Sequence, residues 1–278
     1  MLPKLTIGLP VRNGEKTLRL VIENILNQTF RDFQLIISDN CSIDSTSNIC
    51  KEYQKKDSRI IFFSHKKNIG GAKNFKYVFS KAKTEYFCWA AADDLRSNNF
   101  LEDNINFLEH NLNYVASASP NRFDNDDSKR LISFDIVGSL EKKIKIFFGN
   151  CWNSHGIFYA IFRRKDLIGC DALGKDFFGM DWAINLFLIK KGNIHRSKNS
   201  YIIFGSEGVS RVNNSWKYYR VKKIEWIFPF FVLNVFIYNL IKDINSLKKL
   251  DIFLTLLKFN TSVFFRHIYF LIQNISRS

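Results

Sequence analysis

Two adjacent carboxylates, Asp93 and Asp94, close an apolar run that begins at Tyr86. Residues 86–90 predict a short buried strand, because aromatic and small residues follow one another there without a charge. Ligands of open α/β sheets bind at the carboxyl ends of the strands, and the pair stands at such an end. Carboxylate oxygens suit Mg²⁺ or Mn²⁺, and a cation held there would neutralise a diphosphate. The alternative is a solvated pair that caps the helix expected near Asn98.

A third carboxylate, Asp181, stands much further along the chain. Apolar residues recur at helical spacing after it, and Lys190, Lys191 and Gly192 are typical of a helix end. Asp181 therefore lies in the first turn of the expected helix, where a negative charge is favourable. A carboxylate in this place could also act as a general base that takes a proton from a hydroxyl group.

The first hundred residues alternate between short apolar runs and helical patterns. The expected strands are residues 5–9, 33–38, 59–64 and 86–90, and the expected helices are residues 15–28, 44–56 and 70–83. Repeated units of this length predict an α/β fold with a mostly parallel sheet flanked by helices. Right-handed crossovers would bring the carboxyl ends of all four strands to one edge of that sheet.

Polar residues follow each of these strands. At the shared edge, Asp39 could accept a hydrogen bond from a nucleotide base or ribose, Lys73 could meet a phosphate and Asp93 could hold a metal ion. Each cluster alone is also compatible with a turn and a helix cap, with Ser42 capping the second helix and Asn68 the third. Their recurrence in phase with the strands favours a common binding site.

The middle of the chain is less regular. The pattern predicts helices at residues 98–111 and 140–148, strands at 114–119 and 157–162, and a polar loop at 120–129. These segments continue the α/β alternation up to the helix of Asp181.

Composition limits the partners of this chain. It has 278 residues, 46% of them hydrophobic, and a formal net charge of +15, which calls for an anionic partner such as nucleic acid, anionic lipid or a phosphorylated small molecule. No helix-turn-helix, zinc-finger or RNA-binding aromatic pattern is present, so nucleic acid is not favoured. The five cysteines form no CxxC pair and no regular framework, which fits a reducing cytosol. No signal peptide pattern is visible at the start.

The usual phosphate-binding loops are absent. A dinucleotide-binding Rossmann domain needs G-x-G-x-x-G directly after the first strand, whereas residues 10–14 read Pro-Val-Arg-Asn-Gly. A G-x-x-x-x-G-K-[ST] loop is also missing. Metal and side chains must then hold the phosphate, which returns attention to Asp93.

Taken together, these motifs resemble the family 2 inverting glycosyltransferases of the GT-A fold. The resemblance rests on Ile7 to Glu15, Asp39 to Thr46, Asn68 to Asn74 and Ala92-Asp93-Asp94; it covers roughly residues 5–95 and resumes at about 155–210. It implies a nucleotide-sugar donor and a divalent cofactor, Mn²⁺ or Mg²⁺.

The resemblance also assigns residue roles. Asp93 matches the metal ligand of the family and Asp181 its catalytic base. The residues expected to contact the donor are Pro10, Arg12, Glu15, Asp39, Lys73, Asn74, Asp94 and Arg211. His155 and Trp182 are the expected acceptor contacts, with a plain turn as the alternative for His155.

Two positions depart from the family pattern. The family often has Asp-x-Asp-Asp where this chain has Ala91-Ala92-Asp93-Asp94, so one carboxylate is missing. Many relatives have His where Gly205 stands, and Arg211 could supply positive charge in its place.

The last part of the chain changes character. Residues 1–215 are expected to form the GT-A domain, with a nucleotide-sugar half at 1–97 and an acceptor half at 98–215. Residues 216–278 are basic and aromatic, and predict helices that lie on an anionic membrane surface. A helical hairpin that packs on the domain, or on a second copy in a homo-oligomer, is the alternative.

The sequence thus predicts a metal-dependent glycosyltransferase. It would move a sugar from a nucleotide sugar, such as a UDP-sugar, to a lipid-linked glycan for a surface polysaccharide (O-antigen or capsule). It would act in the cytoplasm, at the inner face of the plasma membrane. A nucleotidyltransferase and a non-catalytic membrane-surface protein of the same fold are the alternatives.

Overall fold

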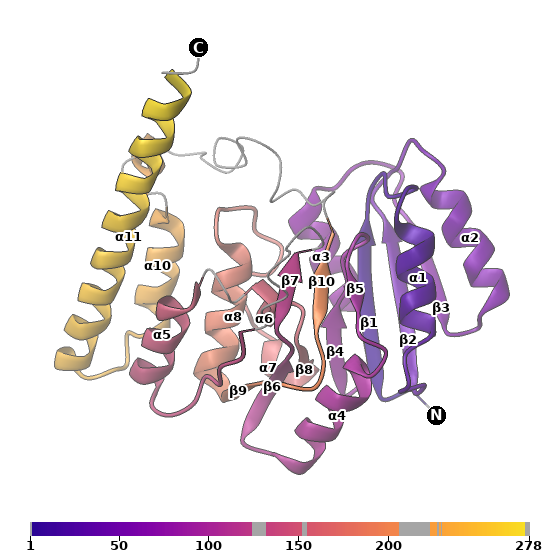
Figure 1. The fold of residues 1–278 in the computed structure, drawn as a ribbon, viewed down its shortest axis with the longest axis horizontal. Helices are drawn as coiled ribbons and strands as arrows, with labels where there is room; N and C mark the ends of the chain where they lie inside the picture. Colours follow the sequence, from indigo (N-terminus) through magenta and orange to yellow (C-terminus); the bar gives the residue numbers. More distant parts are fainter. Residues whose placement is uncertain are drawn as a thin grey trace.

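The computed structural model describes residues 2–123, 132–151, 155–205, 223–226, 228 and 230–275. A seven-stranded sheet forms its centre, in the order β3-β2-β1-β4-β8-β6-β9 (Figure 1). The strands are β1 (Leu5–Val11), β2 (Phe33–Asp39), β3 (Ile60–Ser64), β4 (Tyr86–Trp89), β6 (Tyr114–Ala118), β8 (Ile161–Arg163) and β9 (Asn193–Arg196). Only β8 runs antiparallel to its neighbours, so the predicted mostly parallel α/β sheet is confirmed.

Helices cover both faces of this sheet (Figure 1). One hydrophobic core lies under α1 (Leu18–Leu26), α2 (Thr46–Lys56) and α4 (Phe100–His110). The other lies under α3 (Gly71–Lys81), α5 (Leu140–Gly149), α6 (His155–Phe158), α7 (Arg164–Leu167) and α8 (Met180–Lys191). Side chains alternate between the two cores along each strand, so Leu35 and Ile37 of β2 enter the first and Ile36 enters the second. Burial on both faces explains the nearly continuous apolar runs of these strands.

A smaller sheet of three short strands lies beside the main one. It consists of β5 (Leu95–Arg96), β10 (Ile202–Phe204) and β7 (Asn121–Phe123), with β10 in the middle. Its pairing brings Gly205, directly after β10, next to the segment that contains Asp93 and Asp94.

Three local predictions are wrong. Residues 157–162 form the end of α6 and the start of β8 rather than one strand, because a short apolar run fits a buried helix and a buried strand equally well. Residues 121–123, predicted as loop, form β7. Ser42 does not cap α2: the cap residue is Ser45, and no side chain bonds there.

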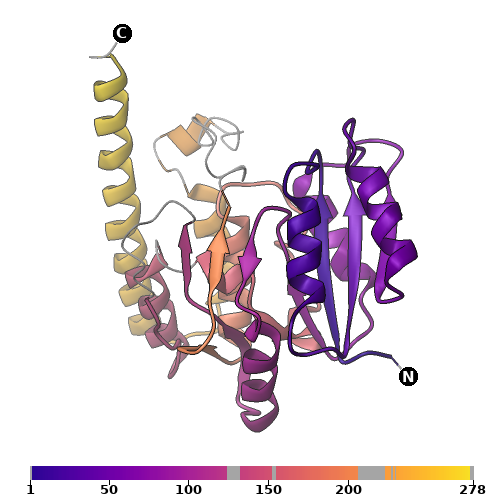
Figure 2. The same ribbon diagram turned by 45° about the vertical axis from the view of Figure 1, so that its right-hand side comes forward.

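Two helices near the end of the chain pack against the domain. Helix α10 (Phe231–Leu240) contacts α8, and α11 (Ser246–Ile275) contacts α5. Their inner faces join the core under α8 with six buried apolar residues: Leu233, Ile237, Leu240, Ile252, Leu256 and Val263. Figures 1 and 2 show α11 at the outer edge, at the opposite end of the molecule from β3 and α2. The predicted domain boundary near residue 215 lies outside the described residues.

No helix in the described part of the chain has both the length and the apolar content to cross a bilayer.

Candidate functional site

The loops after β1 and β2 are joined by hydrogen bonds. The Asn13 backbone N–H donates to Ser42 Oγ (2.8 Å), and Asn13 Oδ1 accepts from the Ile43 N–H (3.0 Å). Glu15 Oε2 accepts from the Ser45 N–H (2.9 Å). Glu15, predicted as a donor contact, therefore holds the neighbouring loop in place at the carboxyl edge of the sheet.

Asp39 is the last residue of β2 and is 1% exposed. Its Oδ1 accepts from both the backbone N–H (3.0 Å) and the hydroxyl (2.5 Å) of Ser42. Ser42, which was a candidate helix cap, instead fixes this carboxylate. Both bonds are accepted by Oδ1.

The other predicted donor residues surround this edge. Pro10 is half-buried near the end of β1, Arg12 follows the strand and is exposed, and Lys73 is exposed in the first turn of α3. Asn74 is buried, and both ends of its side-chain amide bond to Ser38. Asn74 Nδ2 donates to the Ser38 carbonyl oxygen, and the Ser38 hydroxyl donates to Asn74 Oδ1. Asn74 thus fixes α3 to β2, whereas Arg12 and Lys73 have the exposure that a ligand contact needs.

Asp94 is buried against the segment that follows β10. It is 4% exposed, and its Oδ1 accepts from the Gly205 N–H at 3.1 Å. A Cβ at Gly205 would overlap the backbone oxygen of Asp93 and lie 2.8 Å from Asp93 Cβ, so the close approach requires glycine. Burial and the charge of Asp93 raise the pKa of Asp94 to about 7, against the opposing effects of Arg96 and the Gly205 N–H.

The pKa of Tyr159 depends both on these carboxylates and on Asp181. Burial raises the pKa of its hydroxyl well above the ordinary value, and the negative charges of Asp94, Asp93 and Asp181 raise it further. Carboxylates almost ninety residues apart in the chain therefore both influence the pKa of this one hydroxyl. No sequence pattern pointed to Tyr159, because it lies in an ordinary apolar run between α6 and β8.

Arg96 is a buried cation next to the same carboxylates. It is 4% exposed, its Nη2 donates to the Trp89 carbonyl oxygen (3.0 Å), and its side chain lies over the Phe100 ring. Its Nε and Nη1 have no hydrogen-bond partner among the residues that the structure describes. Its positive charge lowers the pKa of Asp94, in opposition to burial and to Asp93. A charged residue two positions after an acidic pair was the available sequence signal.

A divalent ion fits the Asp93–Asp94 pair. Within the described ranges, no three His, Cys, Asp or Glu side chains come together as a closed metal site. Mg²⁺ often takes only one or two carboxylates and fills its other positions with water and phosphate oxygens. Burial and Asp93 disfavour the charged form of Asp94, and a bound cation would favour that form.

Asp181 lies in the first turn of α8, after Gly179 in the left-handed conformation (φ 87°). Trp182 is 5% exposed and stacks on Phe230 at 5.2 Å, with an angle of 7° between the rings. The indole is therefore part of the core, and its position does not support the acceptor contact predicted for it. The side chain of His155 and all of Arg211 lie outside the described residues.

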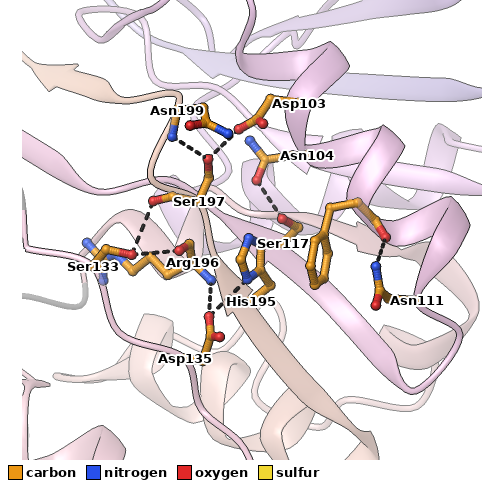
Figure 3. Close-up of polar contacts among 11 residues, drawn as sticks. Asp103, Asn104, Asn111, Ser117, Ser133, Asp135, His195, Arg196, Ser197 and Asn199 are labelled. Carbon is orange, nitrogen blue, oxygen red and sulfur yellow. Dashed lines mark hydrogen bonds and ion pairs between the residues drawn. The ribbon is translucent and has the colours of Figure 1, made fainter.

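A second polar cluster lies at β9, around His195 (Figure 3). His195 Nδ1 lies 2.9 Å from Asp135 Oδ1, and the ring stacks on Phe107 at 3.6 Å. The same Asp135 oxygen accepts from the Arg196 N–H (2.8 Å), and the Ser133 hydroxyl donates to the Arg196 carbonyl oxygen (2.6 Å). These bonds tie the segment before α5 to the edge strand, and we assign the cluster to structure.

Comparison with known proteins places this geometry in a family. Residues 6–170 match the family described as Glycosyl transferase family 2. The chain is 26% identical over 215 residues to the GalNAc(5)-diNAcBac-PP-undecaprenol beta-1,3-glucosyltransferase of Campylobacter jejuni, over 75% of this chain and 68% of that one. It is 23% identical over 223 residues to glycosyltransferase GlyA of Streptococcus pneumoniae, over 79% of this chain but only 31% of GlyA.

Solved structures share the fold. Residues 1–349 of S. aureus TarS, in complex with UDP-GlcNAc, superpose with a TM-score of 0.71 at 17% identity, over 93% of this chain and 73% of that one. The mannosyltransferase PcManGT of Pyrobaculum calidifontis, in complex with GDP-Man and Mn²⁺, gives 0.55 at 14% identity, over 78% and 60%. At these identities the likeness shows the fold alone, and it confirms the predicted GT-A architecture. By the family match over more than half of its length, the chain belongs to glycosyl transferase family 2.

Proposed function

We propose that this chain is an inverting glycosyltransferase that takes a sugar from a nucleotide sugar and transfers it to a glycan acceptor. The observation that supports the proposal is that Asp93, Asp94 and Asp181, from two distant parts of the chain, all lie near enough to Tyr159 for their charges to raise the pKa of its hydroxyl. An acidic pair that can hold a metal-bound diphosphate and a separate carboxylate that can accept a proton are the two requirements of this reaction.

The reaction assigns one task to each carboxylate. The nucleoside would bind at Asp39, and Asp93 would hold the divalent ion that offsets the charge of the diphosphate. Asp181 takes the proton from the acceptor hydroxyl, whose oxygen forms a bond to the anomeric carbon from the face opposite the leaving group. The bond from that carbon to the diphosphate breaks, and the nucleoside diphosphate leaves with the electron pair.

The donor and acceptor classes rest on similar proteins. The TarS structure contains UDP-GlcNAc, which supports a UDP-sugar as the donor. The C. jejuni relative is named for a diphosphate-linked undecaprenol substrate, which supports a lipid-linked glycan as the acceptor. We propose that this chain acts in the synthesis of a surface polysaccharide, in the cytoplasm at the inner face of the plasma membrane.

The test measures sugar transfer and donor hydrolysis from a panel of nucleotide sugars, with and without Mn²⁺. We expect Asp181→Asn to lower kcat by at least about a hundredfold while the donor still raises the melting temperature. Asp93→Ala should lower activity and also abolish the Mn²⁺ dependence of donor binding. Asp171→Asn removes an exposed carboxylate outside the site and serves as the matched control.

Full activity in Asp181→Asn and Asp93→Ala would overturn the assigned roles. Release of pyrophosphate from a nucleoside triphosphate would instead identify a nucleotidyltransferase. Turnover of no donor at all would support a non-catalytic protein that has kept the fold.

A further inference from the structure

The outward face of α11 carries a row of exposed apolar side chains, here called the α11 stripe. Its members are between 48% and 78% exposed: Leu247, Leu250, Phe253, Leu254, Leu257, Phe265 and Tyr269. Most are three or four positions apart, which places them along one side of a helix. Large apolar residues concentrated on one exposed face of a helix mark a surface that contacts another phase or molecule.

This face is not the one that packs on the domain. Ile252, Leu256 and Val263 fill the core on the inner face, and Asn260 Nδ2 donates to Asn234 Oδ1 of α10 (3.3 Å). Helix α11 is thus apolar on two faces, and the domain covers only one of them. A helix of this kind needs a second apolar environment.

Basic residues outnumber acidic residues on α11. The helix has four basic residues and a single acidic residue, Asp251, which forms an ion pair with Lys145 of α5. Lys248 and Lys258 are exposed, and Lys258 directly follows Leu257 of the stripe. The apolar face is therefore combined with positive charge that no acid on α11 balances.

We propose that the α11 stripe binds the surface of an anionic lipid bilayer, with the helix axis in the plane of the membrane. Apolar side chains would enter the region between headgroups and acyl chains, while the lysines would extend their amines to lipid phosphates. Phe253, Phe265 and Tyr269 are residue types that suit this depth.

A second copy of the chain fits this face less well. Each copy has a net charge of +15, and two stripes pressed together would bury Lys258 from each side while the one acid on α11, Asp251, is paired with Lys145. A bilayer that contains anionic lipid supplies the opposite charge and leaves the amines hydrated. Charge complementarity thus favours lipid over self-association.

The position of α11 is compatible with this contact. It forms the outer edge of the molecule, with no other described element beyond it (Figures 1 and 2). The inference does not require the proposed activity, because binding to lipid can be measured without a donor or an acceptor.

The experiment is flotation of the full chain with vesicles of phosphatidylcholine alone or with added phosphatidylglycerol, at low and high salt. The stripe variant is Leu250→Glu with Leu254→Glu. The matched control is Leu112→Glu with Ile168→Glu, two exposed apolar residues on other parts of the surface. Thermal unfolding of each variant shows that it is folded.

We expect the wild type and the control to float with anionic vesicles, more strongly at low salt than at high salt. The stripe variant should bind at least about tenfold more weakly, because two carboxylates enter the contact face. Equal binding by the stripe variant, or no binding by the wild type, would overturn the proposal. A dimer in light scattering that the stripe variant dissociates, without vesicle binding, would show that a second copy covers this face.

Discussion

Tyr159 is the residue whose pKa responds to all three carboxylates of the proposed site. Burial and the charges of Asp93, Asp94 and Asp181 raise the pKa of its hydroxyl, which like that of an ordinary tyrosine is protonated at neutral pH. A protonated hydroxyl can donate a hydrogen bond to one of them or to a sugar oxygen. Its ring packs between Phe158 and Phe204, which fixes its position.

Removing this hydroxyl should affect catalysis more than folding. Tyr159→Phe keeps the ring contacts, so the free energy of unfolding should change by no more than about 1.5 kcal/mol. We expect kcat/KM for sugar transfer to fall by about tenfold or more. Steady-state kinetics and chemical denaturation measure the two effects, with the exposed Tyr238→Phe as the control. A large loss of stability with unchanged kinetics would show a purely structural role.

A second prediction at the level of single residues concerns Gly205. Gly205→Ala would force the new methyl group into the Asp93 backbone, so the segment that contains Asp93 and Asp94 must shift. We expect about 1–3 kcal/mol lower stability and a lower affinity for Mn²⁺. Gly149→Ala is the control, because a Cβ there meets nothing within 4 Å. Unchanged metal affinity would mean that the segment adapts without moving its carboxylates.

Some of the residues in the proposed site could be predicted from the sequence, and others could not, for a physical reason. Asp93 and Asp181 stand at the end of an apolar run and at the start of a helix, and both boundaries are visible in the local pattern. Tyr159 and Arg96 matter because of what folding places beside them, and no local pattern shows that. Trp182 looked like a ligand contact because it follows Asp181, but neighbours on a helix point in different directions.

At the scale of elements, the loops after β1 and β2 form one unit. Asp44 belongs to it: its Oδ1 accepts from the Thr46 N–H (3.0 Å) and its Oδ2 from the Glu15 N–H (3.2 Å). Burial opposes ionisation, but the hydrogen bonds from Thr46 and Glu15 outweigh it and lower the pKa of Asp44. A carboxylate with a lowered pKa stabilises the fold wherever it is ionised.

The stabilisation by Asp44 should therefore depend on pH. It is fully present above the pKa of the unfolded chain, near 4, and is lost as the pH falls through the lower pKa of the folded state. Asp44→Asn should reduce the free energy of unfolding by about 1 kcal/mol at neutral pH. The difference between variant and wild type should shrink below about pH 4. Denaturation curves at several pH values test this, and a difference independent of pH would contradict it.

Long helices and strands could be predicted from the sequence, whereas very short ones could not. The four parallel strands and their helices each supply enough residues for an apolar period to show. Strands β5, β7 and β10 have two or three residues each, which is too few for alternation to appear. Their existence depends on pairing between segments that are distant in the chain.

At the scale of the whole molecule, the C-terminal helices complete the core of the domain. Phe230 is 1% exposed, stacks on Trp182 and lies 5.1 Å from the Phe259 ring of α11. The composition of residues 216–278 suggested a basic, aromatic helical region. It did not show which face each helix would turn toward the domain, because both faces of α11 are apolar.

Truncating this aromatic contact should destabilise the whole molecule. Phe230→Ala should lower the free energy of unfolding by about 3–5 kcal/mol, because a buried aromatic ring leaves a cavity. Phe228→Ala, at a ring that is 43% exposed, should cost less than about 1 kcal/mol and is the matched control. Chemical denaturation measures both. Similar losses for the two variants would mean that α10 does not pack as described.

The contact between Phe259 and Trp182, at 5.7 Å, has a mechanical consequence. One aromatic pair joins the outermost helix to the residue next to Asp181. We expect a tilt of α11, whatever surface causes it, to shift Trp182 and with it the first turn of α8. Shortening the chain at its C-terminal end would remove this brace, so the truncated protein would keep its reacting groups but lose the rigidity that aligns them.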